Sequence, residues 1–211
     1  MNLSDMTALV RQDLHDEDAT NYRWTNDELS RHIARAVMEF SKDIPLEVKE
    51  TLTTTGSPRS LDISSLTARV CIFAVEWPVE EYPPCYCRFS VFSDTLNLLT
   101  DAVPAAGEDV YLYYGRLHAL DDEESTIPSH LENVVAAGAA AFALRQMAAY
   151  TLNRVSVGGE KTPQEFRAEA DNLYDFFKKQ VKLASYKNRI RTGRLYIPSR
   201  PPVNQSRDYG P

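Results

Sequence analysis

Residues 178–211 concentrate positive charge in a chain that is otherwise acidic. They contain nine Lys or Arg and one acid, Asp208, a net of +8, whereas the whole chain has a formal net charge of −7. Residues 1–177 therefore carry −15. These cations could neutralise DNA phosphates, dock on an acidic protein surface, or only keep the segment solvated. Because the rest of the chain is too acidic for a duplex-binding domain, we favour docking on a protein.

The segment after Arg191 has no hydrophobic periodicity and is rich in proline. It cannot bury enough apolar surface to fold alone, yet it holds more large apolar side chains than a solvating linker needs. We therefore expect residues 189–211 to form an extended basic tail that becomes ordered on a partner. The candidate partner-binding residues of this arm are Arg189, Arg191, Arg194, Tyr196, Ile197 and Arg200.

Other residue types that could do chemistry lack the spacing that chemistry needs. The four histidines are far apart, and the acidic run 121–124 lacks the alternation and the glycine of a calcium loop. Gly158-Gly159 lacks the spacing of a phosphate loop, and the three cysteines form no zinc pair or disulfide framework. The sequence therefore predicts a protein that is not an enzyme, with no catalytic residues, no cofactor and no metal ion.

The longest apolar stretch, residues 134–149, is alanine-rich and interrupted by Arg145, so we expect no membrane span. The first residues are acidic and amphipathic, unlike a signal peptide. An odd count of three cysteines favours a reducing compartment.

Helical periodicity governs both ends of the chain, and a period of two governs the middle. The pattern predicts helices at about 3–15, 26–44, 128–153 and 163–188, with Thr25 and Glu28 forming a capping box at the second. In residues 50–117 it predicts about five short, mostly antiparallel strands, with a hairpin turn at 93–95.

The predicted fold class is α+β. We expect a mainly helical bundle of about four helices, with a small antiparallel β region inserted at about 50–117 and an extended C-terminal arm. Residues 1–188 would form the domain and 189–211 the tail. Small residues in the third helix allow a close approach of another helix, and we expect that packing to lie within the bundle. These residues are Ala137, Gly138, Ala140 and Ala141.

Several segments resemble one known family. Residues 22–37, Tyr-Arg-Trp-Thr-Asn-Asp-Glu-Leu-Ser-Arg-His-Ile-Ala-Arg-Ala-Val, resemble the opening of tailed-bacteriophage head–tail adaptor (connector) proteins. Residues 109–118, Asp-Val-Tyr-Leu-Tyr-Tyr-Gly-Arg-Leu-His, continue the likeness, as do residues 128–132 and the alanine-rich helix. The similarity covers most of residues 3–185 and rests on the order and character of the segments, since there is no invariant active site.

The resemblance implies a structural virion protein at the neck, made in the cytoplasm of a bacterial host. It implies a homo-oligomeric, dodecameric ring beneath the portal protein, which extends the DNA channel and provides a platform for the next tail component. The arm would then dock on the portal. DNA would pass through the lumen without sequence-specific binding, since an acidic channel repels phosphates.

Two other functions remain open from the sequence. One is a tail terminator or neck-completion protein, which would form a ring of another symmetry. The other is a nucleic-acid-binding accessory protein that uses the basic tail, which predicts a DNA affinity that falls steeply with salt.

Overall fold

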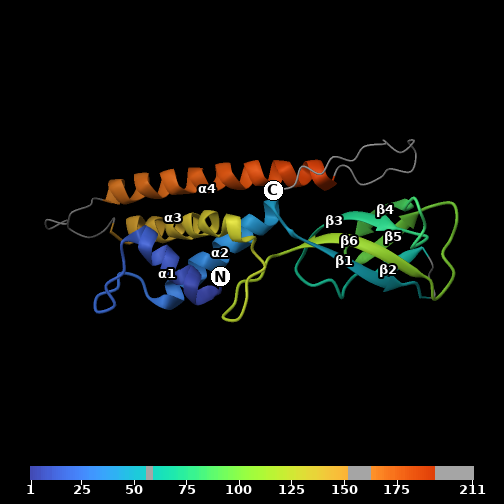
Figure 1. Cartoon of the computed structure of the whole chain (residues 1–211), viewed down its shortest axis with the longest axis horizontal. Helices are drawn as coiled ribbons and strands as arrows, with labels where there is room; N and C mark the ends of the chain where they lie inside the picture. The colour runs from blue at the N-terminus through green and yellow to red at the C-terminus, as the bar shows by residue number, and fades with distance from the viewer. Residues whose placement is uncertain (56–58, 152–162, 193–211) are drawn as a thin grey trace. The chain divides into compact units, whose positions relative to one another are not determined.

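The computed structural model describes residues 1–55, 59–151 and 163–192 (Figure 1). It divides into two units, a helical unit formed by Met1–Ile44 and His118–Ser185 and a sheet unit formed by Pro45–Leu117 together with the chain from Tyr186 onward. The helices are α1 (Leu3–Leu14), α2 (Asn26–Asp43), α3 (Glu132–Thr151) and α4 (Pro163–Thr192), with a 3-10 helix at Ser129–Leu131. The strands are β1 (Leu46–Thr53), β2 (Ser60–Asp62), β3 (Arg69–Glu76), β4 (Tyr86–Phe92), β5 (Thr95–Leu99) and β6 (Asp109–Arg116).

The prediction of a mainly helical bundle with a small inserted β region is wrong. The middle of the chain forms a six-stranded antiparallel sheet that begins at Leu46, and it has a hydrophobic core of its own. The sequence pattern missed β1, because this strand begins before the predicted β region and has no fully buried residue to mark it. The core is built from Leu61, Ile63, Leu66, Val75, Leu96, Leu98, Val110, Leu112 and Tyr114.

The strands follow the order β1-β6-β3-β4-β5-β2 across the sheet. β1 and β6 pair along their whole length, whereas β3 and β4 share only the pairs of Val75 with Cys87 and Glu76 with Tyr86. The predicted hairpin is confirmed: β4 and β5 pair up to Phe92 and Thr95, and Ser93 in the two-residue turn has a φ of 52°. The sheet is thus assembled from long-range pairings together with one local hairpin.

The helical unit begins with two capped helices. Thr25 and Glu28 form the predicted capping box of α2, with the Glu28 amide donating to the Thr25 hydroxyl at 3.2 Å. Asn2 forms an equivalent box with Asp5 at the start of α1. The caps satisfy amides that have no partner inside a helix, so they fix where each helix begins.

A buried ion pair holds the connection between α1 and α2. The Arg11 guanidinium lies 2.6 Å from the Asp16 carboxylate and donates to the Trp24 carbonyl at 3.0 Å. Asp16 in turn accepts from the Arg23 amide at 2.7 Å, and the Arg11 guanidinium stacks over the Tyr22 ring at 3.5 Å. A buried charge with this many partners ties the loop firmly to the end of α1.

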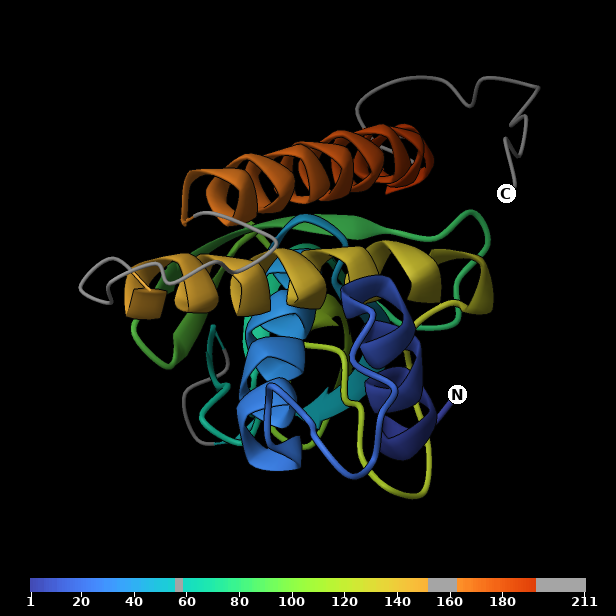
Figure 2. The same cartoon turned by 90° about the vertical axis from the view of Figure 1, so that its left-hand side faces the viewer.

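The helices of this unit lie in three layers. Figure 2 shows α3 between α4 and the pair formed by α1 and α2. α3 is apolar around its circumference, and its residues 134–144 are all buried. A helix that buries every side must have neighbours on every side, which is why α3 occupies the middle layer.

Candidate assembly surfaces

The predicted arm begins later than the sequence analysis placed it. α4 continues through Arg189 and Arg191 to Thr192, so these two residues belong to a helix and not to an extended segment. Arg189 and Arg191 are good helix formers, no Gly or Pro occurs between Asn188 and Gly193, and cations at a helix C-terminus are favoured by the helix dipole. The other four predicted arm residues, Arg194, Tyr196, Ile197 and Arg200, lie outside the described residues.

The small-residue face of α3 packs inside the helical unit, as expected. Ala137 is 6% exposed, and Gly138, Ala140 and Ala141 are buried as well. A Cβ built on Gly138 would lie 2.9 Å from Cδ2 of Phe177, a fully buried residue of α4. Glycine therefore lets the aromatic ring sit directly against the α3 backbone, and this face is not free for another subunit.

Polar contacts add to this packing along the inner side of α4. The Tyr174 hydroxyl donates to Glu39 of α2 at 3.2 Å, and Lys178 lies 3.5 Å from Asp43. Arg145 of α3 stacks over the Tyr174 ring at 4.1 Å. α4 is thus fixed to both α2 and α3 through one side only.

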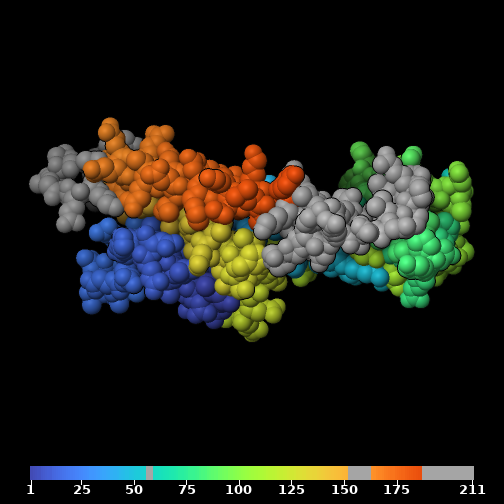
Figure 3. Space-filling view, turned by 45° about the horizontal axis from the view of Figure 1, so that its top comes forward, coloured from blue at the N-terminus to red at the C-terminus, as the bar shows by residue number. Residues whose placement is uncertain are grey.

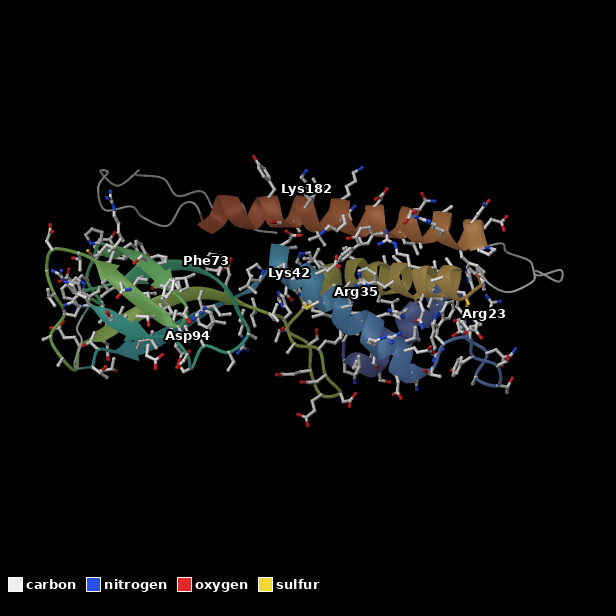
Figure 4. All side chains as sticks on the ribbon, turned by 180° about the vertical axis from the view of Figure 1, so that it is seen from behind. Arg23, Arg35, Lys42, Phe73, Asp94 and Lys182 are labelled. Atoms are coloured by element: carbon white, nitrogen blue, oxygen red, sulfur yellow. The ribbon has the colours of Figure 1, made fainter. Side chains whose placement is uncertain are left out.

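The opposite side of α4, which we call the outer face, is apolar and cationic. Phe176, Leu183 and Tyr186 are 45%, 55% and 66% exposed. They recur at helical spacing together with Lys179, so they lie along one stripe, and Lys182 borders it. Figure 3 shows α4 at the surface of the helical unit, and Figure 4 shows Lys182 on the side of α4 away from α3.

The outer face stands out because isolated exposed apolar residues are ordinary, whereas a row of them on one helix is typical of an interaction surface. From Lys178 to Thr192 the chain has six Lys or Arg and no acid. The predicted helix at 163–188 did not include this face. The signal was present as a second series of apolar residues, Phe176, Leu183 and Tyr186, which are seven and three residues apart.

One face of the sheet carries a cluster of tyrosines and glutamates, which the sequence analysis also missed. The Tyr113 hydroxyl donates to Glu76 at 2.6 Å, and the Tyr111 hydroxyl donates to Glu80 at 3.0 Å. Lys49 lies 3.5 Å above the Tyr111 ring. Burial and the hydrogen bond to Glu76 raise the pKa of Tyr113 far above its usual value. The alternation of Tyr111 and Tyr113 in β6 was the signal that could have revealed it.

The residues considered for catalysis have structural roles where they are described. His15 ends α1 in a left-handed conformation, with a φ of 52°. His118 packs against Phe40 with the ring centroids 5.3 Å apart. Asp121 accepts hydrogen bonds from the amides of Glu123 and Glu124, which closes the acidic run into a turn.

Metal-binding clusters and membrane-spanning helices are both absent from the described part of the chain. Among residues 1–55, 59–151 and 163–192, no group of three His, Cys, Asp or Glu side chains lies close enough to hold a metal ion. No helix within these same ranges is long and apolar enough to cross a membrane.

Comparison with known proteins finds a distant structural likeness. No protein-family model matches the chain, and neither does any curated protein. Among solved structures, a chain described as "Neck of empty GTA particle computed with C6 symmetry" matches over 79% of this chain and 87% of that chain. The sequence identity is 14% and the TM-score is 0.29. Values this low establish neither a shared fold nor a shared function.

Proposed function

We propose that this chain is a structural virion protein, a head–tail adaptor that forms a ring beneath the portal. The ring extends the DNA channel and carries the next tail component. The arm docks on the portal, and DNA passes without sequence-specific contacts. The sequence resemblance of residues 22–37 and 109–118 to phage adaptors motivates the proposal.

The observation that carries the proposal is the outer face of α4 together with the basic segment 193–211 directly after this helix. α4 has 30 residues, about 45 Å of helix, and its exposed stripe lies just before that segment. An apolar stripe with cations beside it can bury surface on one protein, while a basic segment with Tyr196 and Ile197 can attach to another. One subunit thus has the means for two separate contacts.

The charge of the remaining chain supports the same function. Residues 1–177 carry a net of −15, so most of the molecule repels nucleic acid. A channel built from such subunits lets DNA slide, because strong phosphate contacts do not form. The same charge disfavours the alternative function of a nucleic-acid-binding accessory protein.

The proposal is tested by mixing the purified full chain with the portal ring of the same genome. A version ending at Thr192 keeps all of α4 and removes only the segment after it. We expect the full chain to co-purify with the portal and the shortened chain to lose most of this binding. Alanine at both Tyr196 and Ile197 should weaken it in the same direction.

Two results would contradict the proposal. Failure of the full chain to bind the portal would remove the adaptor function and favour a tail terminator. Binding to DNA that is lost on truncation and falls steeply with salt would favour the accessory protein.

A further inference from the structure

We infer that the outer face of α4 docks on the acidic side of the helical unit of a second copy. This inference rests on the proposed function, because it identifies the contact that would join neighbouring subunits of the ring. In this interface, the exposed stripe of Phe176, Lys179, Leu183 and Tyr186 binds a second copy of the chain and no other protein. The portal then has only the arm as its partner in this chain.

The acidic side lies across the helical unit from the outer face. It consists of exposed carboxylates on α1, on the loop after it and on the turn that follows His118. Figures 1 and 2 both place α1 and this turn on the side of α3 opposite to α4. The Leu3 amide donates to the Asp121 carbonyl at 2.8 Å, which fixes the turn to the start of α1. The carboxylates are Asp5, Asp13, Glu17, Asp18, Asp121, Asp122, Glu123 and Glu124.

Charge complementarity identifies the second copy as the occupant. Residues 178–192 of α4 carry six Lys or Arg and no acid. The helical unit without α4, residues 1–44 and 118–151, has fourteen acids and six Lys or Arg, a net of −8. Opposite charges on two surfaces attract copies of the chain to each other, and they set the orientation of the encounter.

The positions of the two surfaces decide the geometry of association. In a two-fold dimer residue i contacts residue j and j contacts i, so a basic and an acidic surface could pair only if both lay within one patch of the subunit. Because the two surfaces lie on opposite sides of one unit, their pairing is head to tail. Head-to-tail contacts close into a ring when the rotation between subunits allows it.

The apolar residues of the stripe also stabilise this contact, in addition to the long-range attraction between charges. Leu183 and Tyr186 are more than half exposed, and burying them against a neighbour removes apolar surface from water. Lys179 and Lys182 can then meet carboxylates at the rim. Added salt should therefore slow association and weaken the contact without abolishing it.

The test uses charge reversal in the full chain and measures mass by sedimentation and mass photometry, with and without the portal ring. One variant carries Lys179→Glu and Lys182→Glu. A second carries Glu17→Lys, Asp122→Lys and Glu123→Lys. A third combines all five changes. The matched control is Arg167→Glu, which reverses an exposed cation of α4 away from the stripe.

We expect each of the first two variants to weaken self-association by roughly tenfold or more. The combined variant should recover much of it, since the two surfaces again carry opposite charges. Arg167→Glu should assemble like the wild type. Recovery in the combined variant also shows that the substitutions leave the unit folded.

Several outcomes would overturn the inference while leaving the proposed function intact. One is that the first two variants form the ring as well as the wild type does. Another is a combined variant no better than either parent. A third is an α4 variant that self-associates normally but fails to bind the portal, since α4 would then be the portal surface. A wild type that forms no ring with or without the portal removes the proposed function as well.

Discussion

Gly138→Ala tests the packing of α4 against α3, because two effects of opposite sign meet at this position. Replacing a glycine inside a helix by alanine stabilises a protein by about 1 kcal/mol through helix propensity. The added Cβ, however, would lie 2.9 Å from Cδ2 of Phe177 and 3.1 Å from two further ring atoms. The first distance is shorter than real Cβ contacts and the second is unusually tight, so either the ring or the helix must move.

The ring has little room to move. Phe177 is fully buried and packs beside Tyr174, with ring centroids 6.2 Å apart. Overpacking of a well-filled core costs about 1–3 kcal/mol. Taking about 2 kcal/mol for the overpacking and about 1 kcal/mol for the gain in propensity, we expect Gly138→Ala to lower the free energy of unfolding by about 1 kcal/mol.

The assay is urea denaturation followed by the fluorescence of Trp24, which is 2% exposed in the core of the helical unit. The chain's other tryptophan, Trp77, lies in the sheet unit and is replaced by phenylalanine in all variants. Ala34→Gly, at an exposed position within α2, measures the propensity difference between the two residues without any clash.

Making the same substitution in a Phe177→Leu variant separates the clash from the gain in helix propensity. In Phe177→Leu the aromatic ring is gone, so Gly138→Ala should there become neutral or stabilising by up to about 1 kcal/mol. If Gly138→Ala instead stabilises the protein equally in both backgrounds, the close approach of α4 to α3 is refuted.

Three further predictions concern buried polar groups. Arg11→Met should lower the free energy of unfolding by about 3–5 kcal/mol because it leaves the Asp16 carboxylate buried and unpaired, and urea denaturation measures this loss. Burial lowers the pKa of His32 below its ordinary 6.5, so the stability that neutral His32 contributes is complete above that value and is lost as the pH falls through the lowered folded pKa. Unfolding curves between about pH 8 and about pH 5 should show this loss in the wild type and a flatter profile in His32→Gln. The raised pKa of Tyr113 means that its contact with Glu76 persists above the ordinary pKa of 10 and is lost only as the pH rises through the folded value. Absorbance titration of tyrosinate should show a late-titrating tyrosine that ionises earlier in Glu76→Gln, and an unchanged titration would contradict the assignment.

Local signals in the sequence predicted local structure well. The capping box of Thr25 and Glu28 depends on residues three apart, and the two-residue turn at Ser93 on residues next to each other. The small residues of α3 predicted a close helix contact, since size alone limits how near two helices can come. Each of these features could be inferred without knowing where the rest of the chain lies.

Features that depend on distant pairing could not be predicted in the same way. β1 has no fully buried residue and is recognisable only through its pairing with β6, more than 50 residues later. The extent of the sheet depends on such pairings. The hydrogen bond between Tyr113 and Glu76 joins two strands that are separated in sequence, and alternation alone names no partner. The outer face of α4 could not be predicted for another reason. When a helix has apolar residues on both sides, the sequence does not show which of them are buried and which are exposed.

The arm was the least predictable part of the candidate site. Its predicted start at residue 189 relied on the loss of hydrophobic periodicity, but a helix rich in Lys and Arg can continue without an apolar face. α4 therefore extends to Thr192 although no inward stripe marks its last turn. The version ending at Thr192 therefore keeps Arg189 and Arg191 and removes Arg194, Tyr196, Ile197 and Arg200.

We propose that copies of this chain assemble as a ring on a portal. Electron microscopy of the portal ring after incubation with the full chain tests it most directly, with the portal alone as the control. We expect an added ring of density that is coaxial with the portal, with α4 of each subunit against the helical unit of its neighbour. Portal particles without added density, or with isolated subunits that do not touch one another, would contradict it.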